Sequence, residues 1–148
     1  MVRQRKEFIL GVDPARGWAV VERRGQEKSV IECGTEQGLN ALLFTLSGLG
    51  EKYPFSEIRV EKPNNRNVWP RPGVSEAGMR RIAVNVGENR NKSDVIIAFF
   101  RGAGHKNILA IPPIKGGTKL SKDRIKALTG YTGRSSEHSR DAIMQAWV

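Results

Sequence analysis

Short runs of apolar residues separated by turn residues dominate the first quarter of the chain. Phe8–Val12 is an apolar run typical of a strand, Pro14–Gly17 carries the proline and glycine of a tight turn, and Trp18–Glu22 resumes the strand pattern. A third strand is predicted over Glu27–Cys33. Three consecutive strands joined by short turns predict an antiparallel meander.

The periodicity then changes to that of a helix, which we expect to cover the sheet. Its apolar face is formed by Leu39, Leu42, Leu43, Leu46 and Leu49. Gly50 and Pro54 end this helix. The next segment, Glu57–Glu61, alternates charged and apolar residues as a half-buried strand does. The strand–helix–strand order favours parallel pairing between this strand and the first.

The following part of the chain is predicted to be mainly helical. Ser75–Phe100 keeps a roughly helical apolar spacing and is interpreted as one long helix or two helices in line. Its end, Val95–Phe100, is apolar all round, which indicates burial on several sides, for example by packing against a second subunit. Asn107–Ile111, stopped by two prolines, is predicted to be a fifth strand.

Two further helices are predicted near the C-terminus. Ser121 begins a short helix whose Ile125 and Leu128 are expected to point inward, and the glycine after it ends that helix. Ser135 or Ser136 begins the last helix, which runs to the end of the chain.

Length and charge limit the class of protein. With 148 residues we expect one α/β domain over residues 1–148, with one buried core. Its five-stranded mixed sheet would have three antiparallel strands followed by parallel additions, flanked by helices. Lys and Arg outnumber Asp and Glu by 25 to 15, a net charge of +10. This excess favours an anionic partner, most often nucleic acid, while a merely basic surface is the alternative.

Several classes of protein are excluded by the cysteine count and by the length of the apolar runs. Cys33 is the only cysteine, which rules out an internal disulfide and favours a reducing compartment. One cysteine and two histidines also rule out zinc-finger spacing. The longest strongly apolar run is too short to cross a membrane, and the basic N-terminal residues lead straight into a strand rather than into a signal peptide. We therefore expect a cytoplasmic protein with no membrane partner.

Two carboxylates stand where predicted strands end. Asp13 ends the first strand and Glu61 ends the fourth, so parallel pairing would bring both to one edge of the sheet, where ligands of such sheets bind. Each acid also has a plainer interpretation. Asp13 can start the turn by bonding its own backbone, and Glu61 can be a surface acid paired with Arg59 or Lys62.

His138 and Asp141 lie three residues apart near the start of the last helix and therefore share one face. With Asp13 and Glu61 they supply three carboxylates and an imidazole, which could hold two divalent ions about 4 Å apart. Mg²⁺ takes oxygen ligands, while Mn²⁺ tolerates imidazole better. The alternatives are a surface histidine and an acid that complements the helix dipole.

Four stretches of the chain resemble the RuvC-type Holliday junction resolvases of the ribonuclease H-like superfamily: ILGVDPARGWAVVE, IRVEKP, NVGENRNKSDVIIAFF with the strand after it, and SSEHSRDAIMQAW. The resemblance implies a ribonuclease H-like fold and an endonuclease that cuts a four-way DNA junction by paired symmetric nicks, using two Mg²⁺ or Mn²⁺ ions per site. It places the catalytic and metal-binding acids on Asp13, Glu61 and Asp141. His138 falls on a position that is often Asp and that some members fill with His. A bacterial cell or a phage-infected host is the implied location.

The resemblance also implies a DNA-contacting segment, Pro113–Leu128, and a homodimer formed through the long helix from Ser75. The candidate DNA-binding residues are Arg16, Lys62, Arg66, Trp69, Arg71, Lys92, Lys115, Lys119, Lys122 and Arg124. Asn64 stands where the family commonly has an aromatic wedge. Trp69 is therefore interpreted either as a replacement that stacks on a base or as a side chain that pins its loop to the protein body.

Two other functions stay open. A different nuclease on the same fold, cutting RNA–DNA hybrids or other branched DNA, would use the same four residues. A non-catalytic basic nucleic-acid-binding protein would bind without metal-dependent turnover. A fragment of a nucleotide-hydrolysing enzyme is disfavoured, because no Gly-rich phosphate loop follows a strand.

Overall fold

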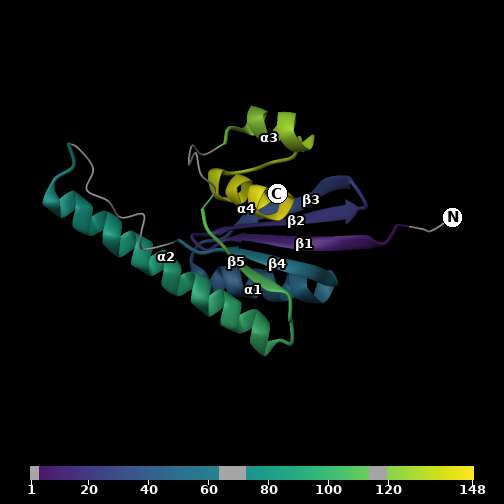
Figure 1. Cartoon of the computed structure of the whole chain (residues 1–148), viewed down its shortest axis with the longest axis horizontal. Helices are drawn as coiled ribbons and strands as arrows, with labels where there is room; N and C mark the ends of the chain where they lie inside the picture. The colour runs from purple at the N-terminus through teal and green to yellow at the C-terminus, as the bar shows by residue number, and fades with distance from the viewer. Residues whose placement is uncertain (1–3, 64–72, 114–119) are drawn as a thin grey trace.

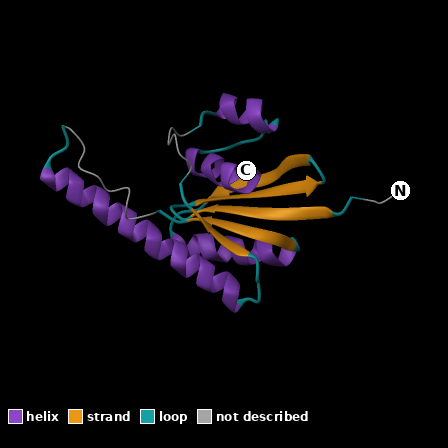
Figure 2. Ribbon diagram, in the orientation of Figure 1, coloured by secondary structure: helices purple, strands orange, loops and turns teal. Residues whose placement is uncertain are grey.

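The structure is a computed structural model that describes residues 4–63, 73–113 and 120–148 (Figures 1 and 2). Nine elements follow one another in this part of the chain: β1 Lys6–Asp13, β2 Gly17–Arg24, β3 Glu27–Thr35, α1 Leu39–Lys52, β4 Phe55–Glu61, α2 Glu76–Gly102, β5 Ile108–Ile111, α3 Lys122–Thr129 and α4 Glu137–Trp147. Every predicted strand and helix is present, with ends that differ by a few residues from the predicted ones.

The five strands form one mixed sheet in the order β3-β2-β1-β4-β5. β1 pairs antiparallel with β2 and β2 with β3, which confirms the predicted meander. β4 pairs parallel with β1 on one side and with β5 on the other. Val12 is registered with Val60, so the acids that follow them, Asp13 and Glu61, end neighbouring strands at the same edge of the sheet.

Both faces of the sheet are covered, because the central strands are apolar at successive positions. Leu10 and Val12 of β1 pack in one core cluster with residues of α1 and of the end of α2. Ile9 points to the other face, where Val21 and Ala146 share its cluster. In Figure 1, α4 lies on one face of the sheet and α1 on the other, with the end of α2 beside α1 and α3 outside α4.

The long segment between β4 and β5 is a single helix, α2, and not two helices in line. Ile96, Ile97 and Phe100 are buried, whereas Val95 is 44% exposed. The protein's own core thus buries the apolar run at the end of α2 on one side, and burial of the other side against a second subunit stays a prediction. The first half of α2 projects beyond the sheet (Figure 1).

One residue of α3 lies differently from the prediction. Ile125 is buried against the α4 side of the sheet, but Leu128 is 44% exposed. α3 has only eight residues and packs through one narrow face. Leu128, three positions after Ile125, lies about 60° away from it around the helix and so falls outside that face. Gly130 ends the helix in the left-handed conformation, as predicted. No helix in the described part of the chain combines the length and the hydrophobicity that a membrane crossing requires.

Candidate metal centre

Asp13 is buried at the end of β1 and uses its two carboxylate oxygens differently. Oδ1 accepts a hydrogen bond of 3.0 Å from the backbone N–H of Ala15, the turn-starting bond of the plainer interpretation. Oδ2 lies 3.1 Å from Nδ1 of His138. The turn therefore fixes the direction of the carboxylate, and the second oxygen stays directed at the side chains of α4.

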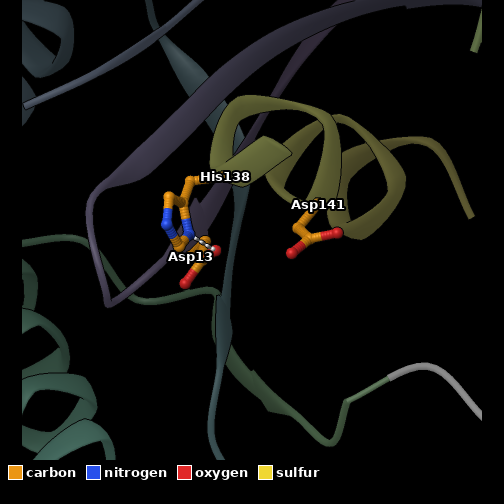
Figure 3. Close-up of side chains that lie close together, drawn as sticks. All are labelled: Asp13, His138 and Asp141. Atoms are coloured by element: carbon orange, nitrogen blue, oxygen red, sulfur yellow. Dashed lines mark hydrogen bonds and ion pairs between the residues drawn. The ribbon is translucent and has the colours of Figure 1, made fainter. Parts of the chain in front are cut away.

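The start of α4 is fixed by its N-cap. Ser136, not Ser135, is the capping residue: its Oγ accepts from the N–H of Ser139, and the Ser139 hydroxyl in turn bonds to the Ser136 backbone N–H. This capping box begins the helix at Glu137 and so sets the rotation of the turn that follows. His138 and Asp141 consequently point from one side of α4 toward Asp13 (Figure 3).

Glycines in the sheet allow α4 to lie unusually close to it. A Cβ at Gly17 would overlap the backbone carbonyl of His138, and a Cβ at Gly11 would overlap the carbonyl of Ala142. Any side chain at either position would push the helix away from the strands. The short approach that brings His138 to Asp13 therefore depends on these two residues.

The three side chains have the composition of a divalent-metal site. Asp13, His138 and Asp141 each offer one ligand atom, and these atoms all lie within 4.8 Å of one another. Two carboxylates and one imidazole suit Mn²⁺, and the carboxylates suit Mg²⁺. Asp13 is buried, while His138 and Asp141 are half-buried and keep some contact with solvent. The donor set therefore fits a divalent cation.

Glu61 lies beside this cluster rather than within the set of closest ligand atoms. Its pKa is raised from 4.5 to about 7, first by burial and then by the negative charges of Asp13 and Asp141, while a hydrogen bond from Gln145 opposes the rise. The predicted alternative, a surface ion pair, is wrong. Arg59 instead pairs with Glu57 at 3.2 Å, and Lys62 pairs with Asp94 at 2.6 Å. Glu61 therefore interacts electrostatically with Asp13 and Asp141.

The candidate DNA-binding residues are only partly described. Arg16 is exposed in the turn after Asp13, and Lys122 and Arg124 are exposed in the first turn of α3. Lys92 is half-buried on α2, and Lys62 is engaged by Asp94. The remaining candidates, together with Asn64, lie outside the described residues: Arg66, Trp69, Arg71, Lys115 and Lys119.

Two residues that contact the site were not singled out from the sequence. Gln145 is buried on α4 and donates a side-chain hydrogen bond to Glu61. Ser93 of α2 donates a hydrogen bond of 2.7 Å to the Glu61 backbone carbonyl. The signal for Gln145 was present: it stands four residues after Asp141, on the helix face that points to the sheet edge. A polar residue at such an inward position is unusual and indicates a polar partner.

Comparison with known proteins identifies the fold. No protein-family model matches the chain, and no curated protein sequence matches it significantly. Among solved structures, the chain is similar to RuvC of T. thermophilus in complex with a Holliday junction substrate, with a TM-score of 0.59 and 10% sequence identity. The similarity covers 95% of this chain and 90% of the RuvC chain. Together with the observed strand order, it shows that the predicted α/β, ribonuclease H-like fold is correct.

Proposed function

We propose that this protein is a metal-dependent endonuclease that resolves four-way DNA junctions by paired symmetric nicks. The observation that carries the proposal is the meeting of Asp13, His138 and Asp141 at one edge of a ribonuclease H-like sheet, with Glu61 electrostatically coupled to the two acids. These are the four residues that the sequence resemblance assigns to catalysis. An acidic cluster in a chain of net charge +10 suits a site where cations join carboxylates to phosphate.

The chemistry of the site follows from its donors. Divalent ions held by Asp13, His138, Asp141 and Glu61 would activate water and stabilise the charge that develops on the scissile phosphate. Asp13 is held in one orientation by the Ala15 N–H and so offers a fixed oxygen. A proton on Nδ1 of His138 donated to Asp13 would leave the lone pair of Nε2 available to bind an ion or to accept a proton.

The charge and shape of the molecule support a junction as the substrate. Arg16 is exposed three residues after Asp13, and Lys122 and Arg124 are exposed in the first turn of α3, a helix that contacts α4. We propose a homodimer formed along α2, whose first half projects from the body and carries exposed Val84. A two-fold dimer with two sites would match the approximate two-fold symmetry of a four-way junction.

The test is cleavage of an immobile four-way junction in a series of Mg²⁺ and Mn²⁺ concentrations. We expect paired nicks at symmetric positions, no cleavage in EDTA, and binding that weakens steeply with salt. The proposal would be overturned if junctions stayed uncut with Mg²⁺ and also with Mn²⁺. An RNA–DNA hybrid and other branched DNAs belong in the same panel, because preferential cleavage of one of them would assign the site to a different nuclease.

A further inference from the structure

Gln145 is an uncharged polar residue in an otherwise apolar place. Its side chain is only 3% exposed, and the neighbours on its helix, Ile143 and Ala146, are core residues. Burial of an amide without hydrogen bonds is unfavourable, so an apolar residue would be expected there unless the amide has a task. The proposed catalytic mechanism gives it none.

Two residues of β4 form hydrogen bonds with Gln145, one with its side chain and the other with its backbone. The side-chain Nε2 donates a long hydrogen bond of 3.5 Å to Oε2 of Glu61. The backbone carbonyl of Gln145 accepts a bond of 3.1 Å from the guanidinium of Arg59. Arg59 and Glu61 are two residues apart and therefore lie on one face of the strand, the face covered by α4. The bond from Arg59 fixes the backbone at Gln145, and this places the side-chain amide of Gln145 next to the Glu61 carboxylate.

We propose that Gln145 is a positioning residue that orients the Glu61 carboxylate toward the cluster of Asp13 and Asp141. The amide binds Oε2 and leaves Oε1 as the oxygen that a cation can take. Without this donor, repulsion from the two neighbouring acids would turn the Glu61 side chain away from them, so the site would have to reorder it each time an ion binds. The inference rests on the proposed function, because it concerns the metal site that this function uses.

The test measures metal binding apart from catalysis. Mn²⁺ is titrated into the protein without DNA, with calorimetry for wild type, Gln145→Met and Ile143→Val. Methionine matches glutamine in length but has no donor, whereas Ile143→Val removes one buried methyl group from the same helix, in an apolar cluster with Ala19 and Ile125. We expect Gln145→Met to weaken Mn²⁺ binding about tenfold, as outer-sphere substitutions commonly do, and Ile143→Val to leave it unchanged.

A double-mutant cycle separates orientation from general packing. In a Glu61→Gln background, Gln145→Met should cause no further loss of Mn²⁺ affinity, because the carboxylate that it orients is absent. Unchanged affinity in Gln145→Met, an equal loss in Ile143→Val, or additive losses in the cycle would each overturn the inference. Failure of the wild type to cut junctions while these metal effects hold would instead overturn the proposed function alone.

Discussion

Gly17 lies against the backbone carbonyl of His138 with no space for a side chain between them. In the β1–β2 pair, Gly17 is the residue opposite Asp13. The glycine and the acid therefore occupy paired positions at the same end of the hairpin, and the first turn of α4 rests on the glycine. Because His138 belongs to that turn, the contact sets the 3.1 Å distance between His138 Nδ1 and Asp13 Oδ2.

Gly17→Ala should therefore damage both stability and activity. The added methyl group would meet backbone atoms, which cannot turn away as a flexible side chain can, so the start of α4 must shift. We expect a loss of about 1–3 kcal/mol in the free energy of unfolding, measured by urea denaturation, together with weaker junction cleavage.

The matched control is Gly48→Ala. Gly48 is an exposed residue inside α1, and nothing lies within 4 Å of the place that an added methyl group would take. Alanine is the better helix former, so this variant should gain about 0.5–1 kcal/mol and cleave as the wild type does. An equal loss in both variants would show that the Gly17 contact is not special.

Much of this arrangement was predictable from the sequence, because strand alternation and helical spacing depend only on local order. The apolar runs gave the strands, and the strand–helix–strand rule gave the parallel pairing that aligns Asp13 with Glu61. The closeness of α4 was not predictable in this way. Gly17 looked like an ordinary turn residue, since nothing in the local pattern shows that a helix far along the chain will press on it.

The site itself was predictable in its residue types but not in its supporting contacts. Asp13, Glu61, His138 and Asp141 were expected together. The structure brings ligand atoms of Asp13, His138 and Asp141 within 4.8 Å of one another, whereas Glu61 lies beside this set. The contact between Gln145 and Glu61 was missed, because it depends on how α4 is rotated over β4. That rotation is set by the Ser136 cap, which is a local contact, and by Arg59 at the other end of the helix, which is a tertiary contact that local patterns do not show.

Asp13→Asn should bind junctions and fail to cut them. Asparagine keeps an oxygen that can accept from the Ala15 N–H, so the turn should survive and the stability should stay within about 1 kcal/mol of wild type. The charge needed to hold a cation is lost, so we expect cleavage to fall by about 100-fold or more. Gel-shift and single-turnover cleavage assays measure the two properties separately, and cleavage at the wild-type rate would remove Asp13 from the catalytic set.

His138 should tolerate aspartate better than alanine. Aspartate can replace the imidazole as a ligand and is also favoured near the start of a helix, so His138→Asp should keep cleavage within about tenfold, while His138→Ala should lose most of it. In EDTA the new carboxylate would face Asp13, so His138→Asp should melt below the wild type and recover when Mg²⁺ is added. Full activity in His138→Ala would show that His138 has no role in catalysis.

The proposed dimer predicts a specific response to charge on α2. Val84 is 57% exposed and Val95 is 44% exposed on this helix. Val84→Lys and Val95→Lys should therefore convert the dimer into monomers of 16.5 kDa, as measured by analytical ultracentrifugation. The control is Phe44→Lys on α1, where a residue 83% exposed receives the same charge outside the proposed interface. A wild type that sediments as a monomer at micromolar concentration, or dissociation caused by Phe44→Lys, would contradict the α2 dimer.

Glu61 predicts a pH dependence whose sign can be worked out. Its pKa is about 7 in the folded protein and near the ordinary 4.5 when unfolded, chiefly because burial disfavours the charged form and Asp13 and Asp141 repel it. Between these values the folded state binds the extra proton, so the stability due to this group is complete below pH 4.5 and is lost as the pH rises through 7. Glu61→Gln carries no such charge and should match the wild type near pH 4.5.

At pH 8 without metal, Glu61→Gln should therefore be more stable than the wild type by up to about 3 kcal/mol, measured by urea denaturation in EDTA. Mg²⁺ or Mn²⁺ should reverse the order, because a bound cation stabilises the ionised carboxylate that the variant lacks. A constant difference across pH 4.5–8, or an identical response of both proteins to metal, would place Glu61 outside the electrostatic site. The crossing of the two stability curves on adding metal is thus the property that distinguishes a metal-binding acid from one that is merely buried.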